Sequence, residues 1–391
     1  MALGLGASLG KTGLTTPGVV TDNLVMKHMY PAGGVQPLSD GAVDINADAA
    51  NNEHIDVGAI SLTTNDVSLS AWVYVTDFVE NAGIICNRES TGTEKGIILR
   101  TDSSGPKFQA LLDYGGGSFE VSSDNANTNE WYHVCVTWDR SDNASMYVNG
   151  VLHNTTDISA QSSVNITHST VAKIGQHQGT VEFRGYICNA GYWDRVLTQT
   201  EIKSIMWKQY ADLTSSETAS LISWWNLDTL TEFDSAGTDD GLIFDENDTT
   251  VGSELLTGFT NGTSYPFDTF TSSGRDISAA IETSGDWGGC VSNAINVTAG
   301  EWYKCTFDLT YNSGTDDIRM AIANNPSGAS TQRSNDTYTS TNGTNTMYFR
   351  VATTDSVAYF QIGTGESADV INFSMSNISL KKMNGNHGEM K

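Results

Sequence analysis

Short runs of apolar residues alternate with polar turn residues along most of this chain. Residues 131–138 form one such run, a polar turn follows at 140–144, and a second run ends at Asn149-Gly150. An Asn-Gly pair adopts positive φ at low cost, so we expect the chain to reverse there as a hairpin. Further runs with the spacing of β-sandwich strands lie at 68–75, 84–86, 96–99, 108–112, 118–121 and 221–228.

A second series of strands is predicted closer to the C-terminus. Its members are residues 277–281, 290–297, 302–309, 318–322, 346–351, 357–362 and 371–380. One short helix is predicted near 199–210, because Thr198 and Glu201 have the spacing of a capping box and Ile202, Ile205 and Met206 share one face. The pattern therefore predicts an all-β protein with two β-sandwiches in tandem.

Shifts in composition divide the chain into five parts. The first 40 residues are rich in Gly and Thr and have sparse apolar positions without a clear period. Such a segment does not bury enough surface to fold alone, so it is either a disordered tail or an irregular arm that orders against a partner, and we predict an attachment arm. The predicted parts are an arm at 1–40, a sandwich at 41–246, a linker at 247–257, a second sandwich at 258–383 and a polar tail at 384–391.

Several motifs resemble known families. The hairpin at 131–150, Lys173-Ile174-Gly175, Phe183-Arg184-Gly185-Tyr186-Ile187 and Trp193-Asp194-Arg195-Val196-Leu197-Thr198 resemble, in order and spacing, laminin-G-like domains, which have the concanavalin-A-like jelly-roll fold. The segments 297–303 and 373–380 resemble carbohydrate-binding-module-like jelly rolls. The resemblance implies that both sandwiches are jelly rolls.

Aromatic residues near turns are the candidates for sugar binding. Sugar-binding jelly rolls stack aromatic rings on pyranose faces. The candidates are Trp287, Tyr265, Phe267 and Tyr311 in the second sandwich and Tyr114 in the first. For Trp287 and Tyr114 the alternative is that the ring packs on the core. The tryptophans expected in the core are Trp72, Trp131, Trp138, Trp193, Trp224 and Trp225.

The charge balance narrows the possible partners. The chain has 46 acidic and 20 basic residues, a net charge of −26, which disfavours nucleic acid. Acidic residues cluster between Lys208 and Arg275, among them Asp234, Asp239 and Asp240. They predict either a solvated acidic turn or a site for Ca²⁺, which prefers carboxylate oxygens. No cofactor is expected to be required.

The cysteines do not resemble a disulfide framework. Five residues, an odd number, are spread along apolar strands. We expect buried free thiols, with a Cys290–Cys305 pair as the alternative if their strands are neighbours. The N-terminal residues lack the basic and apolar regions of a signal peptide, and no stretch is long enough to span a membrane. We therefore expect synthesis in a cytoplasm and no membrane insertion.

Catalytic motifs are missing from the sequence. Glycosidases of the concanavalin-A-like fold have a Glu-x-Asp-x-x-Glu triplet, which this chain lacks. The seven histidines include no His-x-x-x-His pair, and there is no nucleophile elbow or phosphate-binding loop. The sequence predicts a protein that is not an enzyme.

The first 20 residues resemble the start of structural proteins of tailed phages, especially marine ones. This resemblance implies a virion protein, decorating the capsid or associated with the tail, made in the host cytoplasm and displayed on the particle as a homo-oligomer. Its arm would dock on other virion proteins and its sandwiches would bind host-surface glycans. The alternatives are a cellular lectin or adhesin and an accessory polysaccharide-active enzyme. The residues expected to dock are Leu3, Leu5, Leu9, Leu14, Val19 and Val20.

Overall fold

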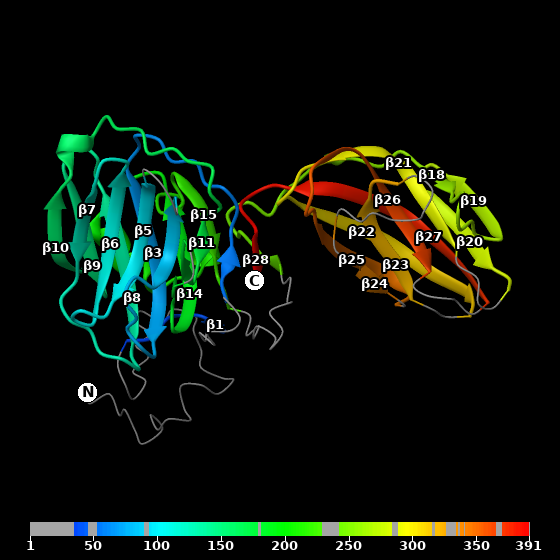
Figure 1. The fold of residues 1–391 in the computed structure, drawn as a ribbon. Helices are drawn as coiled ribbons and strands as arrows, with labels where there is room; N and C mark the ends of the chain where they lie inside the picture. Colours follow the sequence, from blue (N-terminus) through cyan, green and yellow to red (C-terminus); the bar gives the residue numbers. More distant parts are fainter. Residues whose placement is uncertain are drawn as a thin grey trace, which may run out of the picture.

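The structure, a computed structural model, describes most of the chain after the arm. The described residues are 35–45, 53–89, 94–178, 181–228, 242–283, 288–314, 317–325, 334, 337–339, 341–364 and 370–390. They form two β-sandwiches, drawn in Figure 1 as a blue-to-green lobe and a yellow-to-red lobe. This confirms the predicted all-β class.

The first sandwich consists of two mainly antiparallel sheets. Its first sheet contains, in spatial order, β1 (Val43–Ile45), β14 (Gly185–Trp193), β3 (Val67–Val75), β8 (Trp131–Trp138), β9 (Asn143–Val148) and β10 (Val151–Asp157), with β15 (Leu221–Trp225) paired to β14. Its second sheet contains β16 (Leu242–Ile243), β28 (Gly388–Met390), β2 (Ile55–Asp56), β11 (Lys173–Ile174), β4 (Gly83–Arg88), β5 (Lys95–Asp102), β6 (Lys107–Tyr114) and β7 (Ser118–Ser122), with the short β12 (Gln176–His177) and β13 (Val181–Glu182) beside β4.

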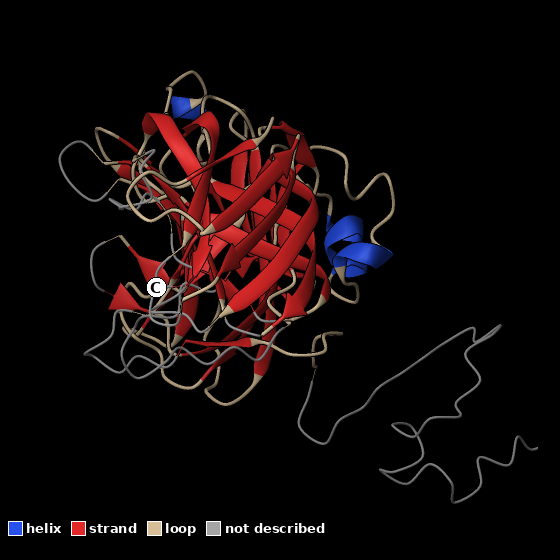
Figure 2. Cartoon of the chain, turned by 90° about the vertical axis from the view of Figure 1, so that its right-hand side faces the viewer, coloured by secondary structure: helices blue, strands red, loops and turns tan. Residues whose placement is uncertain are grey.

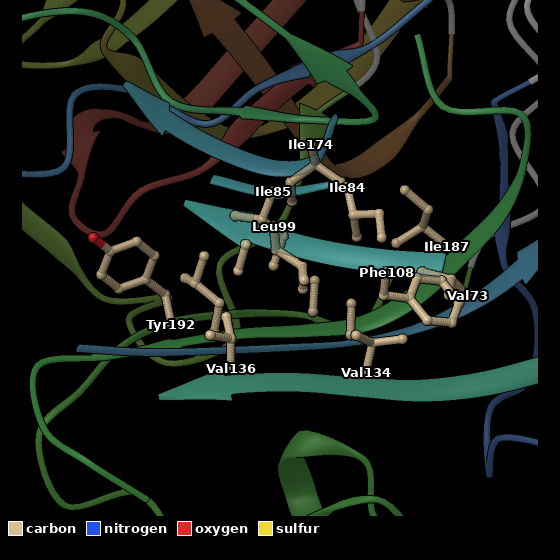
Figure 3. Close-up of a cluster of buried hydrophobic side chains, with 14 of the residues drawn as sticks. Val73, Ile84, Ile85, Leu99, Phe108, Val134, Val136, Ile174, Ile187 and Tyr192 are labelled. Carbon is tan, nitrogen blue, oxygen red and sulfur yellow. The ribbon is translucent and has the colours of Figure 1, made fainter. Parts of the chain in front are cut away.

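The core of this sandwich lies between the two sheets. Figure 3 shows side chains from both sheets pointing toward one another, among them Val73 and Val134 from the first sheet and Ile85 and Leu99 from the second. All four are at most 1% exposed. Because successive strand residues face opposite sides, the residues between these core positions face outward.

Helix α1 (Gln199–Ile205) covers part of the outer face of the first sheet (Figure 2). The predicted capping box is present: the Thr198 hydroxyl accepts from the Glu201 amide, and the Glu201 carboxylate accepts from the Thr198 amide. Ile202 and Ile205 are buried against this face, as predicted. The helix is shorter than the predicted range, and a separate 3₁₀ turn follows at Tyr210–Asp212; another such turn lies at Ser159–Gln161.

The predicted hairpin is also present. Asn149 and Gly150 have φ of 50° and 74°, so both residues adopt the left-handed conformation that an Asn-Gly turn requires. The turn joins β9 to β10 and contacts α1, since a Cβ on Gly150 would lie 2.8 Å from the Lys203 side chain.

The second sandwich has its own two sheets and its own core. One sheet contains β19 (Thr269–Ser273), β20 (Asp276–Ile281), β27 (Ile371–Met383), β22 (Trp302–Ser313) and β25 (Gly343–Arg350), with β17 (Val251–Glu254) paired to β27. The other contains β18 (Phe259–Asn261), β21 (Gly289–Val297), β26 (Asp355–Thr364), β23 (Ile318–Ala323) and β24 (Thr337–Thr339). Phe307, Phe349 and Phe360 are among its fully buried side chains.

The end of the chain differs from the predicted polar tail. Residues 388–390 form β28, which lies between β16 and β2 in the second sheet of the first sandwich, as Figure 1 shows at the red end of the ribbon. The second sandwich is therefore inserted between two neighbouring strands of the first. Part of the predicted linker, Val251–Glu254, is a strand as well. Both segments are too short and polar to show a strand pattern in the sequence.

The cysteines are all buried and free, as predicted. Cys290 lies in β21 and Cys305 in β22, which belong to different sheets, and neither forms a disulfide. Burial raises the pKa of the Cys86 and Cys188 thiols to about 12. No helix in the described ranges is long and apolar enough to cross a membrane.

Candidate functional site: an aromatic row on the first sandwich

Three aromatic side chains form a row across the outer face of the first sheet. Tyr74 of β3 stands opposite Trp131 of β8 on one side and opposite Tyr186 of β14 on the other. The ring centroid of Tyr74 lies 5.6 Å from that of Trp131 and 5.7 Å from that of Tyr186, both in edge-to-face geometry. Asp44 of β1 stands opposite Tyr186 and extends the same register line. We call Tyr74, Trp131 and Tyr186 the aromatic row.

The alternation of strand side chains explains why these rings face outward. Val73 and Val75 point into the core and are fully buried, so Tyr74 between them points to the other face. Trp131 likewise precedes Tyr132, which is buried against the core. All three rings of the row are half-buried. The row thus presents partly exposed aromatic surface on the outer face of this sheet.

A pocket of about 350 Å³ lies over the row. Its floor includes the three rings, and its wall is the segment that leads into β1. The wall residues are Gln36, Pro37, Ser39, Asp40, Gly41 and Ala42.

Specific contacts hold this wall in place. The Asn189 side-chain amide donates to the Leu38 carbonyl at 3.1 Å, and the Ser39 hydroxyl donates to the Gly41 carbonyl at 2.7 Å. A Cβ on Gly41 would lie 2.0 Å from the Asp228 carbonyl oxygen, so only glycine allows the two backbones to approach so closely. The segment is therefore anchored from both sides beside the row.

The chemistry of the pocket fits a polyhydroxylated ring. The flat faces of tyrosine and tryptophan pack on apolar C–H surfaces, while carboxylates and amides bond to hydroxyl groups. Asp40 and Gln36 are exposed in the wall and supply such groups next to the rings. A pocket with an aromatic floor and a polar wall is expected to bind a small polar molecule that has an apolar face.

A second pocket, of about 270 Å³, lies at the junction of the two sandwiches. Arg350 and Glu301 from the second sandwich line it, with Asp56 from the first. Arg350 pairs with Glu389 at 2.5 Å, Glu301 pairs with Lys382 at 3.0 Å, and Asp56 lies 3.3 Å from His54. Each of these three charged groups is thus paired with a charged or titratable residue beside it.

The described sugar-binding residues predicted in the second sandwich differ in their exposure. Phe267 is buried, 2% exposed, with its ring stacked on Phe270 at 6.3 Å and edge-on to Phe373 at 5.6 Å. Its ring is part of the core and does not face a ligand, which corrects the prediction for this residue. Tyr311 is half-buried and also packs on Phe373, at 6.4 Å. Tyr265 is 48% exposed, and Trp287 lies outside the described residues.

Tyr114, the candidate in the first sandwich, lies far in the fold from the aromatic row. It ends β6 in the second sheet, and its ring is half-buried with its centroid 5.5 Å from that of Phe119. A Cβ on Gly117 would lie 2.6 Å from the Tyr114 hydroxyl, so the ring folds back over its own turn. The structure therefore does not combine Tyr114 with the other predicted residues.

The residues predicted to bind a metal or to dock on a partner are not among the described residues. Asp234, Asp239 and Asp240 lie outside the described residues, and so do Leu3, Leu5, Leu9, Leu14, Val19 and Val20. Within the described ranges, no group of three or more His, Cys, Asp or Glu side chains has a geometry that could hold a metal ion.

The aromatic row itself was missed from the sequence. Five of the six tryptophans expected in the core are buried, but Trp131 is half-buried on the outer face. The alternation around Tyr74, between two valines, is a signal that one aromatic ring faces outward. That Trp131 and Tyr186 join it depends on strand register, which the sequence does not give.

Comparison with known proteins finds a family similar to part of the first sandwich. Residues 49–203 match the family described as the concanavalin A-like lectin/glucanases superfamily. No curated protein matches the chain.

Several solved structures are similar to parts of this chain. A protein from Bacteroides ovatus ATCC 8483 described as carbohydrate binding is 23% identical, with a TM-score of 0.36, over 48% of this chain and 54% of its own, so the chain spans about half of that protein. The heptameric SAP-like pentraxin of Limulus polyphemus is 16% identical, with a TM-score of 0.34, over 41% and 78%. A structure titled CBM4 structure and function is 21% identical, with a TM-score of 0.26, over 32% and 94%. Within the first sandwich, residues 49–203 are thus similar to the concanavalin A-like lectin/glucanases superfamily.

Proposed function

We propose that this chain is a carbohydrate-binding protein and that the aromatic row is its sugar-binding surface. The observation that supports this most is the register of Tyr74, Trp131 and Tyr186 across three neighbouring strands, under a pocket with a polar wall. Three rings held by one sheet are a rigid platform, so little conformational entropy is lost when a ligand binds. The concanavalin A-like superfamily, which includes lectins, is consistent with this function.

The charge of the chain points to a neutral ligand. A net charge of −26 repels sulfated and other polyanionic glycans, and Asp40 adds a carboxylate in the pocket wall. Hydroxyl groups of a neutral sugar, in contrast, donate hydrogen bonds to such a carboxylate. We therefore assign neutral sugars to the row.

We propose binding without hydrolysis. Glycosidases place two carboxyl groups on either side of the bond that is cleaved. Of the described residues that line the pocket, Asp40 alone has a carboxylate. Hydrolysis by the usual two-carboxylate mechanism is therefore not supported at this site.

The role on a virion, with the arm as attachment segment, stays a prediction. It depends on residues 1–40, of which 1–34 lie outside the described part of the chain. Sugar binding through the aromatic row is compatible with a cellular lectin as well as with a protein displayed on a particle, where many copies would raise the avidity.

A glycan array tests the proposal. The full chain is applied beside Trp131→Ala and beside Tyr265→Ala, a matched removal of an exposed ring from the second sandwich. We expect neutral glycans to be bound by the full chain and by Tyr265→Ala and lost in Trp131→Ala. Equal binding by Trp131→Ala and the full chain, or loss in Tyr265→Ala alone, would overturn the assignment to the row.

A further inference from the structure

One large exposed ring next to the row has no role in the fold's core. Trp207 follows helix α1 and is 50% exposed. Its ring lies on Trp72, with centroids 6.1 Å apart. Trp72 precedes Tyr74 by two residues in β3, so it lies on the same face of the sheet as the row. Trp207 therefore borders the row on the side of the helix.

The position of Trp207 is fixed by its neighbours. The Trp72 indole N–H donates to the Met206 carbonyl at 2.8 Å, which ties the residue before Trp207 to β3. On one side, Met206 contacts the Gly150 turn, and on the other the Tyr210 amide lies 3.4 Å from the Asn226 side-chain oxygen. The segment between them thus crosses the outer face of the sheet and holds Trp207 beside the row.

Trp207 extends the aromatic surface in a second direction. The row runs across the strands, from β8 to β14, whereas Trp72 and Tyr74 follow one another along β3. Two residues along a strand span about 6.6 Å. Trp207 packs on Trp72 and is not among the residues that line the pocket over the row, so its ring lies beside the pocket.

We propose that the ligand is a neutral oligosaccharide, with one sugar unit on the aromatic row and a further unit stacked on Trp207. This inference rests on the proposed function, because it adds a second subsite to the same surface. An apolar ring half-exposed to water is then explained by the sugar face that covers it in the complex. The net charge of −26 again disfavours polyanionic glycans at this surface.

The test is affinity as a function of ligand length. Calorimetry is carried out with neutral gluco-oligosaccharides of α-1,4, β-1,4 and β-1,3 linkage, from the monosaccharide to the hexasaccharide, and with dextran sulfate as the polyanionic probe. The variants are Trp207→Ala, Trp207→Phe, which keeps a ring, and Trp131→Ala on the row. Thermal unfolding of each variant checks that it is folded.

For Trp207→Ala we expect an affinity about tenfold weaker for the longer oligosaccharides, the effect of one aromatic contact, and unchanged affinity for the shortest ligand bound. Trp207→Phe should recover part of the loss. An equal loss at every length, or no loss at any length, would overturn the second subsite. If Trp131→Ala leaves all affinities unchanged, the proposed function itself fails, whatever Trp207 does.

Discussion

The Arg350 guanidinium and the Glu389 carboxylate form an ion pair across the junction of the two sandwiches, with Nη1 and Oε2 2.5 Å apart. Arg350 ends β25 of the second sandwich, and Glu389 lies in β28, which pairs with β2 and β16 of the first. Glu389 is 3% exposed. The last strand of the chain therefore completes the first sandwich and also ties the second sandwich to it.

Removal of this strand should loosen the first sandwich, although the deleted residues follow the second. In a chain that ends at His387, the backbone partners of β2 and β16 in β28 are gone, and so is the partner of Arg350. We expect faster hydrogen exchange at the amides of Ile55 and Asp56. The control chain ends at Met390 and lacks Lys391 only. Unchanged exchange in the chain that ends at His387 would show that β28 does not stabilise this sheet.

A buried ion pair joins β4 and β6 in the second sheet of the first sandwich. The Arg88 Nε lies 2.5 Å from Asp113, and both residues are nearly buried; Arg88 also pairs with Glu94, whose side chain is 40% exposed. In Asp113→Ala the buried guanidinium of Arg88 loses the Asp113 carboxylate, so we expect the free energy of unfolding to fall by about 3–5 kcal/mol. The exposed partner is the control: Glu94→Gln should cost less than about 1 kcal/mol. Urea unfolding measures both, and equal losses would contradict this account.

Stability should fall in mild acid because of His133. Burial lowers the pKa of its imidazole to about 3, and its Nε2 lies 2.8 Å from the Ser70 hydroxyl. The unfolded chain binds a proton near pH 6.5 and the folded chain does not, so stability is full above pH 6.5 and is lost as the pH falls toward 3.

The slope attributable to this group is up to about 1.4 kcal/mol per pH unit. Urea unfolding at pH 6.5 and pH 5 should show this part of the change in unfolding free energy in the natural chain, and it should be missing in His133→Gln. Burial raises the pKa of Glu217, but hydrogen bonds from Lys208 and Thr214 outweigh this effect and lower the pKa to about 2. The contribution of this carboxylate to stability is therefore lost only below about pH 4.5, outside this interval. The same slope in both proteins would contradict the assignment to His133.

The five thiols should not react while the protein is folded. All are buried, and burial raises the pKa of Cys86, Cys135, Cys188, Cys290 and Cys305. The reactive form of cysteine is the thiolate, so a disulfide reagent such as dithiobis-nitrobenzoate should titrate five thiols in denaturant and none, on the same time scale, in buffer. Rapid reaction of any thiol in buffer would place that residue at the surface.

Local signals in the sequence predicted local structure well. The Thr198–Glu201 capping box and the Asn149-Gly150 turn depend on residues within a few positions, and both are found as expected. β28 could not be predicted, because a strand of three residues has no period of its own and exists through its partners in β2 and β16. The aromatic row likewise depends on the register between strands. Trp131 and Tyr186 are 55 positions apart in the sequence, and only strand pairing brings both beside Tyr74.

A crystal structure of the chain with the neutral oligosaccharide that it binds most tightly would show directly where the sugar lies. We expect a sugar ring on the faces of Tyr74, Trp131 and Tyr186, with its hydroxyl groups bonded to the wall that contains Asp40. A sugar bound at the junction of the two sandwiches or at Tyr265, with the aromatic row uncovered, would contradict it.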